Sequence, residues 1–301
     1  MEYWGINMSM VRLGLTLILC VISIRIMAEF NLIEELSYST VRIHCKLANG
    51  GDSIGTCFAM AFKSGKDGFA PVLITNKHVV RDSISISFVL TEMIDGLPAP
   101  TQFPLTLPIG ESMWRKHPDD NVDLCALPMG AVINALQSQG KHVKISWLPL
   151  DIIASDADFR GMVQLDEVVM IGYPNGIYDE INNQPIFRRG SFATNPALDY
   201  NGKKEFVIDI AAYNGSSGSP VFVKYEVSRF DREKRAIVIQ DHPSIKLVGV
   251  LSSGFVHSAT GAIIPVQIPT AVIPAPITAI PNNLGIVIKA ERIREMEQLL
   301  F

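Results

Sequence analysis

The sequence predicts an all-β protein built as a barrel or a sandwich. Short apolar runs, several of them alternating with polar residues, recur along the chain, and turns rich in Gly, Pro and Asp separate them. Helical patterns are confined to residues 131–139, which end at Gly140, and to residues 290–300. This organisation does not fit the regular alternation of strands and helices that builds a parallel α/β sheet.

The composition is that of an ordinary globular protein. Of the 301 residues, 48% are hydrophobic and 19% are charged, which is enough for a large buried core. The net charge of −4 gives no reason to propose nucleic acid as a partner. The length suits one unit of two subdomains.

Residues 1–30 are interpreted either as an apolar leader or as a mis-assigned start. The apolar stretch 13–24 follows Arg12, as in a signal peptide, and is shorter than the about 20 residues that a membrane span needs. A retained leader predicts an exported protein, or one tethered to a membrane through residues 11–27. Alternatively, translation starts at Met27, which predicts a cytoplasmic protein without membrane contact.

The first half of the chain, residues 31–150, is predicted to be β-rich. The run from Pro98 to Pro108 contains four prolines, which fits a loop or the edge of a sheet. Strands are predicted at residues 40–47, 55–62, 72–74 and 83–90.

A polar stretch at residues 151–161 is predicted to link this half to the second half, residues 151–301. The charged run 230–235 is interpreted as a solvated hairpin tip, and residues 271–281 are Pro-rich and extended. Strands are predicted at residues 167–171, 186–193, 205–212, 220–225, 236–240, 247–251 and 286–288.

Cysteine usage fits a protein without disulfides. Cys20 lies in the apolar leader, whereas Cys45, Cys57 and Cys125 lie in apolar, strand-like runs. Three buried thiols indicate a reducing compartment, or a bacterial protein that needs no bridges. Because no Cys and His residues have metal-ligand spacing, we predict no metal site, and we predict no cofactor.

A loop of small residues, NGSSGSPVF at 214–222, stands between two of the predicted strands. Small residues let a chain turn sharply and bring backbone N–H groups close to a ligand. Ser217 in its centre is a candidate nucleophile, with Ser216 and Ser219 as rivals. Such turns are also common as plain loops, and a serine hydroxyl is a weak nucleophile unless a base activates it.

Two further stretches offer the base and a group to orient it. His78 lies in the run TNKHVV, which ends the strand-like run 72–74, and Asp123 stands at the head of the apolar run 124–127. No other histidine follows an apolar strand in this way. Because position 219 is Ser, the serine loop does not fit the G-x-S-x-G elbow of α/β-hydrolases.

Together these stretches resemble the motifs of trypsin-like (chymotrypsin-fold) serine peptidases, especially the disulfide-poor bacterial branch that includes the HtrA/Deg proteases. The order His, Asp, Ser is that of this class. The resemblance covers roughly residues 35–300, and Ser216 and Ser219 depart from the family's usual Asp or Asn and Gly. The matching runs are TNKHV at 75–79 (like T-A-x-H-V), DLCAL at 123–127 (like D-L-A-[VL]-L), GSSGSP at 215–220 (like G-[DN]-S-G-G-P), GTCF at 55–58, IGYP at 171–174, and VGV at 248–250 running into SSG at 252–254.

The resemblance implies a fold of two six-stranded antiparallel β-barrels with a C-terminal helix that closes the second barrel. Residues 31–150 would form the first barrel and carry His78 and Asp123. Residues 151–301 would form the second barrel and carry Ser217.

The resemblance also implies a serine endopeptidase. Ser217 would attack the peptide carbonyl, His78 would accept and return the proton, and Asp123 would hold the imidazole. The backbone N–H groups of Gly215 and Ser217 would form the oxyanion hole. Two alternatives stay open, namely a catalytically inactive domain that binds extended peptides and a hydrolase of acyl esters.

The partner implied is a protein or peptide substrate. Ala211, six residues before Ser217, would form the bottom of the S1 pocket and favour a small or apolar P1 residue. Ser252, Ser253 and Gly254 would pair with the substrate backbone as an added strand does. The sequence predicts no oligomeric state.

Overall fold

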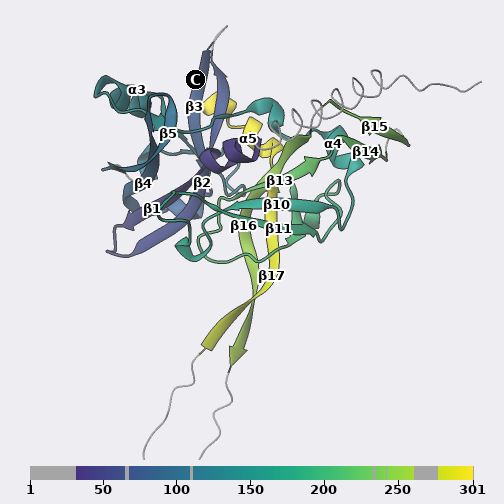
Figure 1. The fold of residues 1–301 in the computed structure, drawn as a ribbon. Helices are drawn as coiled ribbons and strands as arrows, with labels where there is room; N and C mark the ends of the chain where they lie inside the picture. Colours follow the sequence, from purple (N-terminus) through teal and green to yellow (C-terminus); the bar gives the residue numbers. More distant parts are fainter. Residues whose placement is uncertain are drawn as a thin grey trace, which may run out of the picture.

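The computed structural model describes residues 32–64, 68–108, 111–232, 235–241, 243–260 and 277–300. The predicted leader and most of the Pro-rich stretch 271–281 lie outside these residues. The described part of the chain is mostly β, as the sequence predicts, and forms two β units joined side by side (Figure 1).

The first unit is a sheet in which neighbouring strands are nearly all antiparallel. Along β1 the side chains of Val41, Ile43 and Cys45 are buried, because every second residue faces the core. Among the described residues the sheet has nine strands, in the order β5-β4-β1-β2-β3-β7-β6, with β8 on β4 and β9 on β2. The strands are β1 (Thr40–Leu47), β2 (Asp52–Ser64), β3 (Gly68–Thr75), β4 (Ser83–Ile94), β5 (Leu97–Leu107), β6 (Arg115–Lys116), β7 (Cys125–Pro128), β8 (Val143–Lys144) and β9 (Leu148–Pro149).

In the described residues this sheet is open, which corrects the prediction of a closed six-stranded first barrel. One edge strand, β5, contains Pro98, Pro100 and Pro104, and proline has no N–H to donate to a further strand. The other edge strand, β6, is only two residues long. The two edges therefore offer few groups that could pair and close the sheet.

The second unit is the predicted six-stranded antiparallel barrel. In the described part of the chain it closes in the order β10-β11-β12-β17-β16-β13. Beyond the barrel, β16 and β17 continue as a paired ribbon (Figure 1), and the predicted hairpin around residues 230–235 is formed by β14 and β15. The strands are β10 (Glu167–Gly172), β11 (Ile186–Phe192), β12 (Glu205–Asp209), β13 (Pro220–Tyr225), β14 (Ser228–Asp231), β15 (Ala236–Ile239), β16 (Ser244–Thr260) and β17 (Ile277–Lys289).

The helices are short. The helix expected at 131–139 is α3 (Gly130–Ser138), and α2 (Lys77–Val80) follows β3 directly. Within the polar stretch 151–161, α4 (Asp156–Gly161) begins at a capping box in which Ser155 and Asp158 bond reciprocally. No helix in the described part of the chain is long and apolar enough to cross a bilayer.

The C-terminal helix is shorter than predicted. It consists of α5 (Glu291–Arg294) followed by a 3₁₀ turn at Glu297–Leu299. Ile293 and Met296 are both fully buried and belong to the core cluster shared by the two β units. The C-terminal segment is therefore held against the core through these two side chains.

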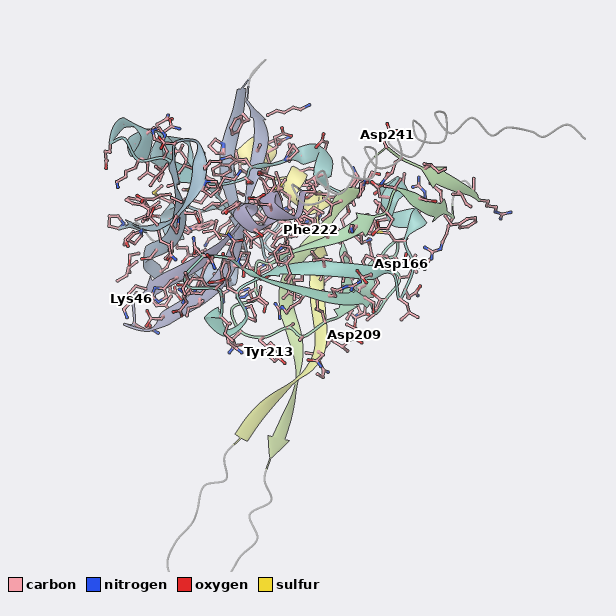
Figure 2. The ribbon with its side chains drawn as sticks, viewed as in Figure 1. Lys46, Asp166, Asp209, Tyr213, Phe222 and Asp241 are labelled. Carbon is pink, nitrogen blue, oxygen red and sulfur yellow. The ribbon has the colours of Figure 1, made fainter. Side chains whose placement is uncertain are left out.

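The two β units share one hydrophobic core. Phe58 and Met60 of β2 pack in the same cluster as Phe222 of β13, Leu247 of β16 and Ile288 of β17. Figure 2 shows Phe222 near the middle of the molecule, where the units meet. This join fixes the loops of the first unit against those of the second.

The three described cysteines are buried free thiols. Burial raises the pKa of Cys45 to about 12 and also raises the pKa of Cys57 and Cys125. These thiols therefore stay protonated at neutral pH and serve as small apolar core residues.

Candidate active site

His78 lies in α2, which follows the end of β3. Val79 and Val80 of the one-turn helix α2 are buried, which leaves the His78 side chain 39% exposed at the surface of the join. The Asn76 side chain donates a hydrogen bond to the Asp123 carbonyl at 2.8 Å. This bond ties the turn that carries the imidazole to the loop that carries the carboxylate.

His78 and Asp123 form a direct pair. The distance from His78 Nδ1 to Asp123 Oδ2 is 2.6 Å, and the His78 backbone N–H donates to Oδ1 at 3.1 Å. The Ser252 hydroxyl donates to the same Oδ2 at 3.0 Å. Burial opposes ionisation of Asp123, but the bonds from His78 and Ser252 outweigh it and hold its pKa below the usual value.

The pair fixes the state of the imidazole. Since an ionised carboxylate only accepts hydrogen bonds, Nδ1 of His78 carries the donated hydrogen. Nε2 of neutral His78 is then left as an acceptor. This is the tautomer that a general base needs.

The loop that carries Ser217 is held by Thr56 of β2. The Thr56 N–H donates to the Ser217 carbonyl at 2.9 Å, and Thr56 Oγ1 donates to the Gly215 carbonyl at 2.9 Å. Gly215 and Gly218 have φ of +82° and +85°, in the left-handed region that favours glycine. The first β unit therefore fixes the conformation of a loop that belongs to the second.

Ser252 links the predicted nucleophile to the pair. The Ser217 hydroxyl donates to the Ser252 carbonyl at 3.4 Å, while the Ser252 hydroxyl bonds Asp123. In the described residues no hydrogen bond joins Ser217 to His78. The rival serines, Ser216 and Ser219, are fully buried, whereas Ser217 is partly exposed.

Two N–H groups of the loop, those of Gly215 and Ser217, are predicted to form the oxyanion hole. The Asn214 carbonyl accepts from the Asn175 N–H, and because a trans peptide is planar, the Gly215 N–H points to the opposite side. The Ser216 N–H donates to the Tyr213 carbonyl at 3.0 Å. Within the described ranges, the N–H groups of Gly215 and Ser217 have no protein acceptor.

The predicted substrate edge lies on β16. Strand β13 pairs with β16 only as far as Val250, whereas Ser253 and Gly254 pair with β17. Among the described residues, this part of β16 thus has a strand partner on one side only. Ser253 and Gly254 are exposed, and Ala211 and Ser252 are half-buried.

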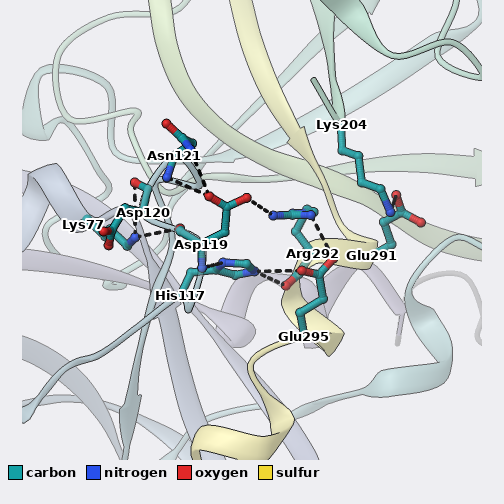
Figure 3. A network of polar contacts seen from close by, with 9 residues as sticks. All are labelled: Lys77, His117, Asp119, Asp120, Asn121, Lys204, Glu291, Arg292 and Glu295. Atoms are coloured by element: carbon teal, nitrogen blue, oxygen red, sulfur yellow. Dashed lines mark hydrogen bonds and ion pairs between the residues drawn. The ribbon is translucent and has the colours of Figure 1, made fainter. Parts of the chain in front are cut away.

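The loop before Asp123 is anchored to the C-terminal helix (Figure 3). His117 is buried, and its Nε2 lies 3.2 Å from the Arg292 carbonyl. Arg292 in turn donates to Asp119 Oδ2 at 2.8 Å, and Lys77, next to His78, donates to the Asp119 carbonyl at 3.1 Å. This network holds the start of the Asp123 loop against both α2 and α5.

Acid is expected to weaken the fold through His117. Burial, and then the charge of Arg292, lower the pKa of His117, although Glu295 partly opposes them. The unfolded chain takes up a proton near the usual pKa of about 6.5, and the folded protein takes it up only at lower pH. The free energy of unfolding should therefore fall below that pH, by at most about 1.4 kcal/mol per pH unit.

Urea unfolding of the wild type and of His117→Gln at pH 7.5 and 5.5 tests this expectation. Glutamine does not titrate, so we expect a smaller decrease in stability for the variant. Equal decreases in the two proteins would contradict it.

Two features of the site have no signal in the sequence. The hydroxyl of Ser252 bonds Asp123, but the sequence predicts only a backbone role for this residue. Arg188 bonds Ser216 at 2.9 Å, and no pattern distinguishes it from the neighbouring Arg189.

In the described ranges no group of three or more His, Cys, Asp or Glu residues could hold a metal ion.

Similar solved structures include HtrA/Deg-type proteases. The HtrA-type protease AlgW with tripeptide has 15% identity and a TM-score of 0.44, and the match covers 90% of this chain and 62% of that one. A protease from M. tuberculosis in its active form has 14% identity and a TM-score of 0.42, covering 87% and 80%. Deg5 has 16% identity and a TM-score of 0.41, covering 75% and 84%. The chain thus spans about three fifths of the length of AlgW.

No curated protein matches the sequence. The family model described as "Trypsin-like peptidase domain" matches residues 55–226. This range is more than half of the chain and includes His78, Asp123 and Ser217. The chain therefore belongs to the family of trypsin-like peptidase domains.

Proposed function

We propose that this protein is a serine endopeptidase in which Ser217 is the nucleophile, His78 the general base and Asp123 the group that orients it. The observation that carries the proposal is the position of Ser252, whose carbonyl accepts from Ser217 and whose hydroxyl donates to Asp123, the partner of His78. In this proposal residues 31–150 contribute the base and the acid, and residues 151–301 contribute the nucleophile.

The first step is the attack of Ser217 Oγ on the substrate carbonyl. Its hydroxyl leaves the Ser252 carbonyl by a rotation about χ1 and turns to Nε2 of His78, which accepts the proton. Asp123 stabilises the imidazolium that forms. The proton then passes from Nε2 to the leaving amine, and water hydrolyses the acyl-enzyme by the same route.

We assign the stabilisation of the negative charge on the attacked carbonyl oxygen to two backbone N–H groups, those of Gly215 and Ser217. Both N–H groups lack a protein acceptor in the described part of the chain, so no protein hydrogen bond has to break before they bind an oxyanion. The loss of a single donor of this kind costs about 2.7–4 kcal/mol of transition-state stabilisation.

The substrate is proposed to be a peptide that adds as a strand to residues 252–254. This part of β16 is paired on one side only in the described residues, and Ser253 and Gly254 are exposed. Backbone hydrogen bonds would hold the peptide and place its scissile carbonyl at Ser217. The structure of an HtrA-type protease with a tripeptide is consistent with such a substrate class.

A fluorophosphonate probe tests the nucleophile. We expect the wild type to be labelled at Ser217 and the Ser217→Ala protein to stay unlabelled. Ser219→Ala is the matched control, because the Ser219 hydroxyl is buried in the same loop and has no hydrogen-bond partner in the described structure. We expect the Ser219→Ala protein to be labelled at Ser217 like the wild type. Labelling that survives in Ser217→Ala, or a wild type that is not labelled, refutes the proposal.

One observation favours a second candidate, an inactive domain that binds extended peptides. The Ser217 hydroxyl points to a carbonyl of its own chain, and no hydrogen bond joins it to His78 in the described residues. The probe separates the two candidates, because a binding domain would stay unlabelled and still bind peptides. Comparison of peptide and ester turnover then tests the acyl-ester alternative.

A further inference from the structure

A partly buried arginine without a carboxylate partner bonds the loop that carries Ser217. Arg188 of β11 donates to the Ala211 carbonyl, and to Ser216 Oγ at 2.9 Å. Its Nε is buried and has no acceptor, and in the described part of the chain it forms no ion pair. Burial lowers the pKa of Arg188 to about 10, so the side chain remains a cation at neutral pH.

The next residue shows what an ordinary arginine does on the same strand. Arg189 points to the other face of β11, its side chain is 75% exposed, and it forms an ion pair with Glu167. Arg188 instead is only partly exposed, its Nε is buried, and both of its acceptors are neutral. Partial burial of a cation without an anion costs hydration free energy, and natural proteins usually pair such a group.

The position of Arg188 relates it to the substrate. Its two acceptors belong to residues 211–216, and Ser216 directly precedes the proposed nucleophile, about 3.8 Å away between Cα atoms. Small residues face one another in the same region. A Cβ built on Gly254 would lie 3.5 Å from the Cβ of Ala212, and one built on Gly285 would lie 3.7 Å from it.

We propose that Arg188 is a specificity-determining residue that favours substrates with glutamate or aspartate at P1. A guanidinium has five N–H groups, and two of those of Arg188 are used by Ala211 and Ser216. The P1 carboxylate accepts from the remaining ones and supplies the missing anion. This inference rests on the proposed peptidase function, and it replaces the small or apolar P1 preference expected from the side chain of Ala211.

A purely structural role is the competing explanation, because Arg188 also bonds Ser216 and thereby holds the loop that carries Ser217. The two roles differ in their dependence on the substrate. Positioning of the loop affects all peptides alike, whereas recognition of a carboxylate affects only acidic P1 residues. Glutamine at P1 has nearly the shape of glutamate without its charge, and it isolates the electrostatic contribution.

The kinetic test uses peptides that differ only at P1, with Glu, Gln or Ala. Because hydrogen bonds between charged groups are stronger than neutral ones, we expect kcat/KM of the wild type to be at least about tenfold higher for Glu than for Gln. Arg188→Met should reduce this ratio to about one or less, and Arg189→Met should leave it unchanged. Equal rates for Glu and Gln in the wild type would overturn the inference.

A binding test does not depend on turnover. Isothermal titration of the Ser217→Ala protein with product-type peptides ending in Glu or Gln compares the two side chains directly. We expect about tenfold tighter binding for Glu, lost when Arg188→Met is added. Equal affinity overturns the assignment of Arg188 even if the wild type is labelled by fluorophosphonate. Conversely, an unlabelled protein that prefers Glu would refute the peptidase but keep the Arg188 site.

The wild-type preference decides the question even if Arg188→Met fails to fold. Thermal unfolding of both arginine variants shows whether their kinetics can be compared. If Arg188→Met folds and slows all three peptides by the same factor, Arg188 only positions the loop and the inference is wrong.

Discussion

Replacement of His78 by alanine is expected to lower kcat for peptide hydrolysis by about 10⁶-fold, because removal of the base of a serine triad costs this much in a measured case. Without the imidazole, the hydroxyl of Ser217 keeps its proton and its bond to the Ser252 carbonyl. The orienting bonds of Asp123 lose their partner as well. Single-turnover kinetics with a peptide substrate would measure the effect.

The chain contains a matched control for this variant. His44 on β1 also pairs with an aspartate, since its Nε2 lies 3.0 Å from Asp52 Oδ1, but this pair lies on the sheet surface. We expect His44→Ala to change kcat by less than about twofold, since a solvent-exposed contact of this kind contributes little. A loss below tenfold for His78→Ala would remove His78 from the proposed mechanism.

Replacement of Gly218 by alanine is expected to destabilise the fold by more than about 4 kcal/mol, or to prevent folding. With φ at +85°, a side chain here is already strained by about 1–2 kcal/mol. In addition, the new Cβ would overlap the Thr56 carbonyl oxygen and lie 2.5 Å from Thr75 Oγ1, and both atoms belong to buried strands. Such atoms cannot move aside without disturbing the join between the two β units.

Gly202→Ala separates the clash from the backbone strain. Gly202 has φ of +74°, but nothing lies within 4 Å of a Cβ built on it. We expect urea unfolding to give a decrease of about 1–2 kcal/mol for this variant. If Gly218→Ala lost no more than Gly202→Ala, the packing of the serine loop against Thr56 would not have the importance given to it above.

Local pattern was enough to predict most strands and to single out His78 and Asp123, whose side chains are in contact in the structure. The strand at 40–47 matches β1, because alternation of polar and apolar residues reports directly on a sheet with one buried face. His78 and Asp123 each border an apolar run, and the structure places their side chains 2.6 Å apart. The pairing of Ser217 with His78 stays a prediction.

The parts that the sequence did not predict depend on contacts between distant segments. The prolines of β5 mark a possible sheet edge in the sequence, but closure of the first sheet also depends on whether β5 can pair with a distant strand such as β6, which no local pattern reveals. Arg188 and Arg189 are identical neighbours, and only the pairing of β11 with β10 decides which one turns inward. The hydroxyl of Ser252 donates a hydrogen bond to the carboxylate of Asp123, which lies 129 residues away in the chain.

The prolines of β5 have a consequence for the behaviour of the protein in concentrated solution. Pro98, Pro100 and Pro104 interrupt the row of N–H donors along an outer strand of an open sheet. A strand from another molecule would need these donors to extend the sheet across the two copies. This border is therefore protected against intermolecular β-pairing, and so against the aggregation to which uncovered sheets are prone.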